Sequence, residues 1–284
     1  MADILWQPMS LPSQGVLYKD KNTGDELLPG GKIEIRKTRG QEDAILLSQG
    51  LDGLDRIAKI INTCSRIPKA KSDQPDRLTQ LDLLLTDRMA ILLALRTLAF
   101  NTPWYNYVYK CQFCSKTTKA WINLIEDLPE RSPETMADNL FAAGEIDNPD
   151  DFVLDEPLTL DLVDEGVTIQ ARFLRGYDEV KIAKRAKRLA MTSNDLGDQS
   201  AIYRQALQIV TINGEEAKDA HKEAFVRQLS SGDLALLRIA VDDLEPGLDL
   251  RIFPTCDKCG ADNELSLPFT AEFFRPTVLK PRHA

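Results

Sequence analysis

The chain has little positive charge and no long apolar run. Its 284 residues carry 35 Lys and Arg against 44 Asp and Glu, a formal net charge of −9. Proteins that bind the phosphate backbone use an excess of Lys and Arg, so general nucleic-acid binding is not expected. The longest aliphatic run, residues 90–95, is far shorter than the roughly 20 residues that span a bilayer. The first residues lack the pattern of a signal peptide, and we expect neither a membrane segment nor an export signal.

Catalytic motifs are also missing. The two histidines, His221 and His283, stand in polar surroundings without the serine, cysteine or carboxylate pattern of a triad. The sequence contains neither a Walker glycine loop nor a dinucleotide-binding glycine fingerprint. We therefore predict that the protein is not an enzyme and has no small-molecule substrate.

Four of the five cysteines form two CxxC pairs, far apart in the chain. Cys111 and Cys114 form the first pair, and Cys256 and Cys259 form the second. Apolar and polar residues alternate on both sides of each pair, which is typical of two strands joined by a turn. A CxxC at the tip of a hairpin is half of a zinc ribbon, and tetrahedral zinc needs four ligands. We therefore predict one structural Zn²⁺ per chain, bound by all four cysteines.

Other interpretations of the cysteines are weaker. A redox CxxC normally opens a helix, whereas both pairs here are flanked by strands. Structural disulfides would need an oxidising compartment, which nothing else in the sequence indicates. The fifth cysteine, Cys64, lies on the apolar stripe of a predicted helix and is expected to be a buried hydrophobe.

A second functional class remains open. Four lysines stand near the CxxC pairs, namely Lys110, Lys116, Lys119 and Lys258. They support a zinc-ribbon nucleic-acid-binding module as the alternative function, and the acidic net charge argues against it.

The two halves of the chain resemble each other. A short strand, an Arg-Gly pair and an acidic helix start occur at residues 33–43 and again at 169–179. Asp87 and Asp233 each open an apolar helix, and a CxxC pair follows each helix. Matching positions are 136 residues apart at the strand and 145 or 146 apart at the helix and the cysteines. We predict an α+β fold in which two pseudo-repeated strand–helices–hairpin units share the zinc-ribbon-like four-cysteine site.

The predicted organisation also includes extended terminal arms. Both ends carry large apolar residues with little periodicity, so residues 1–18 and 273–284 are expected to dock on other proteins. The competing interpretation is that both ends fold back onto the chain's own domains. The expected parts are an extended N-terminal arm (1–30), a first repeat unit (31–125), an acidic, proline-containing linker (126–166), a second repeat unit (167–270) and a C-terminal tail (271–284).

Several strings of the sequence resemble a known family. They are LPSQGVLY (11–18), IEIRKTRGQED (33–43), LLLTDRMAILLALR (83–96), the first CxxC hairpin and CDKCGADNELSLPFTAEFFRP (256–276). In this order they resemble baseplate proteins of contractile-tailed bacteriophages of the T-even type, related to a baseplate hub component. The resemblance covers roughly residues 11–276, and the four cysteines match the family's zinc-ligand pattern. It implies a virion or tail-assembly protein of the hub region, made in the host cytoplasm, whose partners are other baseplate and tail proteins.

Overall fold

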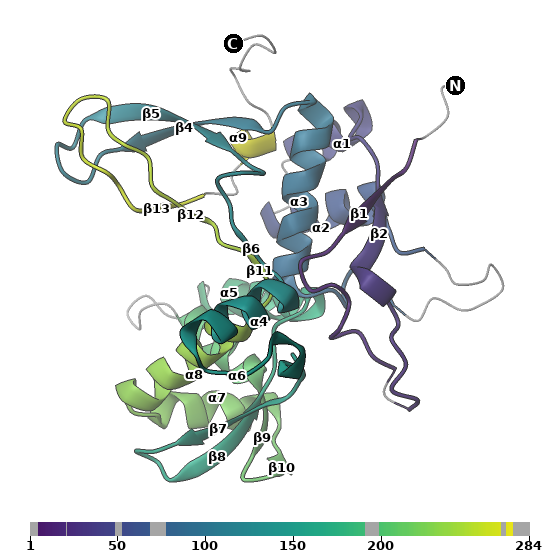
Figure 1. The fold of residues 1–284 in the computed structure, drawn as a ribbon, viewed down its shortest axis with the longest axis vertical. Helices are drawn as coiled ribbons and strands as arrows, with labels where there is room; N and C mark the ends of the chain where they lie inside the picture. The colour runs from purple at the N-terminus through teal and green to yellow at the C-terminus, as the bar shows by residue number, and fades with distance from the viewer. Residues whose placement is uncertain are drawn as a thin grey trace.

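Helices and small antiparallel sheets are combined in this chain, as predicted. Figure 1 shows a first sheet with its helices beside α3 (Leu85–Phe100), a long hairpin that extends to the other side, and helices above a second sheet at the lower end. No helix among the described residues is long and apolar enough to span a membrane. The computed structural model describes residues 5–20, 22–48, 53–68, 78–190, 199–267 and 271–274.

Helix α3 is the centre of the first half. It is apolar nearly all round, and Ile91, Leu92 and Leu95 are buried. In the strand beside it, Ile33 and Ile35 point into the core while the residue between them faces outward, which is the period-two pattern of a half-buried strand. The other elements of this half are β1 (Gln7–Ser10), a 3-10 turn (Pro29–Gly31), β2 (Lys32–Ile35), α1 (Gly40–Leu47), α2 (Gly53–Cys64) and β3 (Ser65–Arg66).

The N-terminal segment packs on this half. Strand β1 pairs antiparallel with β2, which in turn pairs with β3. Leu11, Leu17 and Tyr18 are buried, and the guanidinium of Arg66 lies 4.4 Å from the ring centroid of Trp6. The prediction of a docking arm is therefore wrong for Leu11, Leu17 and Tyr18, which are buried on the chain's own first half, whereas Leu5 is 72% exposed. Residues 1–4 lie outside the described residues.

The C-terminal helix α9 (Ala271–Phe274) also packs on the chain itself. Phe273 and Phe274 are buried, and the backbone carbonyl of Phe273 accepts a 2.7 Å hydrogen bond from Nε of Arg96 in α3. The docking prediction is wrong for these two residues for the same physical reason. The rest of the predicted tail, 275–284, lies outside the described residues.

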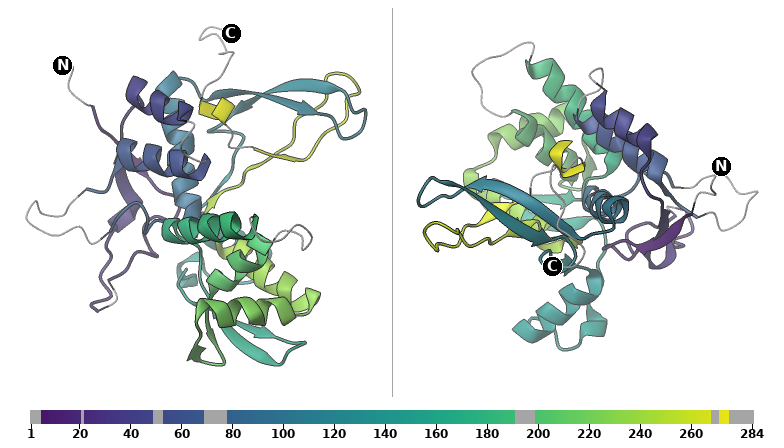
Figure 2. Two further views of the ribbon diagram at one scale, coloured as in Figure 1. Left: turned by 180° about the vertical axis from the view of Figure 1, so that it is seen from behind. Right: turned by 90° about the horizontal axis from the view of Figure 1, so that it is seen from above.

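Two hairpins carry the CxxC pairs. Strands β4 (Trp104–Lys110) and β5 (Thr117–Asn123) pair along their whole length. The second hairpin is shorter, with β12 (Arg251–Ile252) paired to β13 (Leu265–Ser266). Figure 2 shows the second hairpin running alongside the first, and both extend away from the body of the molecule.

The predicted linker 126–166 is not a linker throughout. It contains β6 (Glu130–Arg131), α4 (Pro133–Ala143), a 3-10 turn (Pro149–Asp151) and β7 (Leu158–Leu162). Strand β6 pairs with β11 (Gly247–Leu248), and β7 pairs along all five of its residues with β8. The second sheet therefore begins before residue 167, where its unit was predicted to start.

The second half contains a four-stranded antiparallel sheet in the order β10–β9–β8–β7. Helices gather above this sheet in Figure 1. Its elements, besides β7, are β8 (Val167–Ala171), α5 (Gly176–Ala190), α6 (Gln199–Gln208), β9 (Ile209–Ile212), β10 (Glu215–Glu216), α7 (Asp219–Gln228) and α8 (Ser231–Leu244).

The elements of the two halves follow a similar order. The first half runs β1, β2, α1, α2, β3, α3 and a hairpin, and the second runs β7, β8, α5, α6, β9, α8 and a hairpin, with β10 and α7 in addition. One arginine–carboxylate ion pair occurs in each half with the same spacing. Arg36 donates to Glu42 over 2.8 Å, and Arg172, 136 residues later, donates to Asp178 over 2.7 and 2.8 Å. One continuous apolar core contains residues from both halves.

Glu245, which follows α8, lies in a cavity between the halves that is lined by α3, α6 and α8. Burial, and then the nearby carboxylate of Asp242, raise the pKa of Glu245 to about 7. Between about pH 4.5 and pH 7 the folded protein therefore keeps a proton on Glu245, whereas the unfolded chain, with the ordinary pKa of 4.5, has released it. Stability from this group is therefore present below about pH 4.5 and is lost as the pH rises to about 7.

We expect Glu245→Gln to remove this loss. Between pH 4.5 and pH 7.5 the unfolding free energy of the variant should gain up to about 3 kcal/mol relative to the natural chain. Urea unfolding across this range measures the difference, and Glu145→Gln, on an exposed residue, is the control. Parallel pH profiles for the natural chain and Glu245→Gln would contradict the expectation.

Candidate metal centre

The structure brings all four predicted cysteines together. Cys111 and Cys114 lie in the turn between β4 and β5, and Cys256 and Cys259 lie between β12 and β13. Their sulfur atoms all lie within 4.8 Å of one another. The Sγ atoms of Cys111 and Cys259 are 3.7 Å apart, and those of Cys114 and Cys256 are 3.8 Å apart.

These distances fit a tetrahedral metal site. A disulfide has its sulfurs about 2.0 Å apart, so neither pair is bonded. Four sulfurs placed tetrahedrally at about 2.3 Å from a zinc ion are separated by about 3.8 Å. The observed separations agree with that edge length, and the four cysteines can therefore hold a metal ion of this size between them.

Each CxxC turn is a knuckle with defined hydrogen bonds. In the first, the N–H of Cys111 donates to the carbonyl of Lys116 over 3.0 Å, and the N–H of Ser115 donates back to the carbonyl of Cys111 over 3.0 Å. The N–H of Phe113 points at the sulfur of Cys111 over 3.4 Å. Ser115 has a φ of 57°, which turns the chain back toward β5.

The second knuckle repeats this pattern. The N–H of Cys256 donates to the carbonyl of Ala261, that of Gly260 donates to the carbonyl of Cys256, and that of Lys258 points at the sulfur of Cys256. Gly260 has a φ of 69°, and a glycine adopts this left-handed conformation without steric cost. Two knuckles of one geometry therefore face each other across the sulfurs.

Two of the thiols, Cys111 and Cys259, have pKa shifts of opposite direction. The backbone N–H of Cys114, helped by that of Phe113, holds the pKa of Cys111 at about 6. The N–H of Ala261 lowers the pKa of Cys259, but partial loss of hydration and the three neighbouring sulfurs outweigh it and raise this pKa to about 12. Four thiolates this close repel one another, so a cation among them is needed for all four to ionise near neutral pH.

Two hydrogen bonds join the knuckles beyond the sulfurs. The N–H of Gln112 donates to Oδ1 of Asn263 over 2.8 Å, and Oγ1 of Thr118 donates to the carboxylate of Asp257. Positions 112 and 257 are 145 residues apart, and so are 118 and 263. The close sulfur pairs, Cys111 with Cys259 and Cys114 with Cys256, are related by the same 145-residue shift. The same residue pairs are therefore in contact when the two knuckles are exchanged, although the hydrogen-bonding groups differ.

Asn263 is a site residue that the sequence did not indicate. Its side chain is fully buried, and its Nδ2 donates to the carbonyl of Ala261 over 3.0 Å while its Oδ1 accepts from the first knuckle. A single polar residue inside a turn has no periodicity that would reveal it. Thr118, 145 positions earlier in the first hairpin, was missed for the same reason.

We expect Asn263→Ala to weaken metal retention. The change leaves the N–H of Gln112 without its acceptor, and loss of a group that orients metal ligands typically lowers affinity by about 10- to 100-fold. Competition with a chromophoric chelator measures the affinity, with Asn106→Ala in β4 of the first hairpin as control. Unchanged affinity would show that Asn263 does not support the site.

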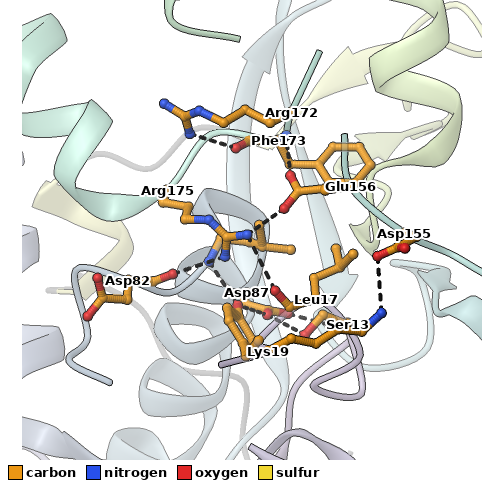
Figure 3. A network of polar contacts seen from close by, with 12 residues as sticks. Ser13, Leu17, Lys19, Asp82, Asp87, Asp155, Glu156, Arg172, Phe173 and Arg175 are labelled. Carbon is orange, nitrogen blue, oxygen red and sulfur yellow. Dashed lines mark hydrogen bonds and ion pairs between the residues drawn. The ribbon is translucent and has the colours of Figure 1, made fainter. Parts of the chain in front are cut away.

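A second polar network fixes the N-terminal segment to α3 and to the second half (Figure 3). The carboxylate of Asp87, at 0% exposure, accepts from the N–H of Ser13 (3.1 Å), from Oγ of Ser13 (2.6 Å) and from the hydroxyl of Tyr18 (2.5 Å). Burial raises the pKa of Asp87, and the donated hydrogen bonds act against this.

Arg175 forms the other part of this network. It donates to the carboxylate of Glu156 over 2.5 Å and to the carbonyls of Asp82 (3.2 Å) and Leu17 (3.4 Å). One guanidinium therefore contacts the N-terminal segment, the chain before α3 and the chain before β7. The network therefore joins three parts of the fold to one another and does not include the cysteines.

Comparison with known proteins identifies the family. A family model described as T4 bacteriophage base plate protein matches residues 24–275. No curated protein and no solved structure gave a significant match. The matched residues include both halves and all four cysteines. The chain therefore belongs to the T4 bacteriophage base plate protein family.

Proposed function

We propose that the protein is a non-enzymatic structural or assembly component of the hub region of a contractile-tail baseplate, stabilised by one structural Zn²⁺. Family membership supports a component of the phage tail whose partners are other tail proteins. The hub position rests on the resemblance of the sequence strings. Assembly in the host cytoplasm fits the free thiols, because reducing compartments keep cysteines available for metals.

The observation that carries the zinc proposal is the pair of sulfur–sulfur distances, 3.7 and 3.8 Å. A site of four thiolates suits zinc or iron. The two facing knuckles complete a four-coordinate site, which is typical of structural zinc because no position remains for substrate. Zinc would neutralise half of the charge of the four thiolates and fix the tips of both hairpins.

The role of the metal follows from the weakness of the hairpins. A two-stranded hairpin alone is marginally stable in water, and the part of the chain described by the structure shows no third strand on β4 and β5. The metal would join residues near position 111 to residues near position 256. In this way it would join the β4–β5 hairpin to the β12–β13 hairpin and make the two hairpins one rigid arm.

We also propose that the two halves are copies of one unit. The similar element order, the ion pairs 136 residues apart and the reciprocal knuckle contacts 145 residues apart support this. The unit would start at β1 and at β7, and the metal would lie near a pseudo-twofold axis between the knuckles.

Incorporation into particles tests the function. In phage carrying a tagged copy, the protein should be found in purified baseplates, and Cys256→Ser should lower its incorporation at least tenfold while Cys64→Ala should not. Normal incorporation of the metal-site variant would contradict a structural role for the metal. Absence of the natural chain from baseplates and from their assembly intermediates would contradict the baseplate role.

The zinc-ribbon nucleic-acid module remains the second candidate. One observation favours it: residues 101–124 contain three lysines, no acidic residue and six aromatic residues. Bases stack on aromatic rings, and lysines attract phosphates. Salt-dependent binding of a single-stranded oligonucleotide by the metal-loaded chain would support this function.

A further inference from the structure

The outer face of the β4–β5 hairpin is exposed and has its own chemistry. Register pairs on this face join Asn106 to Trp121, Val108 to Lys119 and Lys110 to Thr117. Val108 is 52% exposed, and Phe113 at the tip is 68% exposed. The opposite face is covered, because Tyr105 packs on Phe273 with ring centroids 5.1 Å apart and Tyr109 donates to the carbonyl of Pro254.

This hairpin differs in charge from the rest of the chain. Lys110, Lys116 and Lys119 are exposed on it, and residues 101–124 contain no Asp or Glu. The whole chain has a net charge of −9, so the other residues together are strongly acidic. An exposed aromatic side chain at the tip of a hairpin that carries exposed lysines suits an apolar pocket with an acidic rim.

Such a pocket lies at the root of the same hairpin. We call it the root groove: it lies between α3, β1 and the segment that follows β5, with a volume of about 460 Å³. Leu93, Leu98 and Leu128 contribute to its apolar lining, and Ile125 on its rim is 65% exposed. Its only charged lining residues in the described chain are Glu126 and Glu130.

The tip cannot reach the root groove of its own chain. A strand rises about 3.3 Å per residue, so seven paired residues separate tip and root by roughly 20 Å. The other large cavity, between the halves, has three arginines in its lining beside three carboxylates, so it offers the lysines no net negative charge. We propose that the tip of one copy, with Phe113 as its anchor, docks in the root groove of a second copy of this chain.

Self-association of the full, zinc-loaded chain tests the proposal. Sedimentation velocity from about 1 to about 100 µM should show concentration-dependent association that weakens with salt. Phe113→Ser at the tip and Ile125→Ser at the groove should each raise the dissociation constant at least tenfold. Phe141→Ser, on the 50% exposed Phe141 of α4, is the matched control and should associate like the natural chain.

Mixing the two variants gives the decisive result. Phe113→Ser retains an intact groove and Ile125→Ser retains an intact tip, so each alone should stay monomeric while an equal mixture forms a heterodimer. A natural chain that is monomeric throughout, or a mixture that does not associate, would overturn the proposal. Binding of a single-stranded oligonucleotide that is lost in Phe113→Ser, without self-association, would assign the face to nucleic acid instead.

The inference rests on the proposed metal site, because the metal would hold the tip rigid. The zinc content of every sample is therefore measured in the same experiment. Chains without zinc would show a failure of the proposed site. Zinc-loaded chains that do not associate would show a failure of the docking proposal alone.

Discussion

Cys256→Ser is expected to release the first hairpin as well as the second. Structural zinc sites contribute on the order of 10–16 kcal/mol of apparent binding free energy, which is comparable to the roughly 5–15 kcal/mol net stability of a domain. Without its fourth thiolate the site should lose zinc, and the separated knuckles should open. The effect should therefore extend to β4 and β5, more than 130 residues earlier in the chain.

Hydrogen exchange measured by mass spectrometry locates this effect. Amides of residues 104–123 should lose protection in Cys256→Ser, and those of residues 251–266 should lose it in Cys111→Ser. The control is Cys64→Ala, which removes a buried thiol outside the cluster and should leave zinc content and hairpin protection unchanged. Loss of protection confined to the mutated hairpin would show that the two knuckles do not share a metal.

Asp87→Ala is expected to cause a large loss of unfolding free energy. The carboxylate accepts three hydrogen bonds in a fully buried position, and its removal leaves Ser13 and Tyr18 with buried donors that have lost their acceptor. Each such group costs about 1–3 kcal/mol, and we expect a total loss of about 3–5 kcal/mol in the unfolding free energy.

Urea unfolding of zinc-loaded protein measures this loss. Tyr18→Phe removes one of the three donors and should cost less than Asp87→Ala. Asp138→Ala, on an exposed residue of α4, should change the unfolding free energy by less than about 0.5 kcal/mol. A loss below about 1 kcal/mol for Asp87→Ala would show that the network around α3 contributes little.

The cysteine cluster could be predicted because its signals are local and repeated. Period-two alternation on both sides of each CxxC predicts a hairpin, and the ligand number of zinc predicts that two half-sites meet. These two signals together are enough to assign Cys111, Cys114, Cys256 and Cys259 to one site. Asn263 and Thr118 carry no such signal, because each is one polar residue inside a turn or strand.

Strands β1 and β7 were missed for a common reason. Each is the first strand of its sheet and lies in a segment whose composition predicts irregular structure. Pro8 stands within the four residues of β1, and β7 follows a run of acidic residues. Only pairing with β2 and β8 makes these segments strands, and such long-range pairing overrides weak local preference.

The N-terminal segment was misjudged because burial there has no period. Leu11, Leu17 and Tyr18 fill gaps between elements instead of forming one face of a helix or strand. The same large apolar residues suit an arm that binds a partner and a segment that completes its own core. Ser13 and Tyr18 decide between the two, through their hydrogen bonds to Asp87, a contact that no sequence pattern reveals.

The most direct test of the shared metal site is the metal content of the purified chain together with its X-ray absorption spectrum. We expect one zinc per chain, surrounded by four sulfurs at about 2.3 Å. Zinc should fall well below one per chain in both Cys111→Ser and Cys256→Ser. Two zinc ions per chain, a site with fewer than four sulfurs, or a metal-free natural chain with intact hairpins would contradict a single zinc shared by the two knuckles.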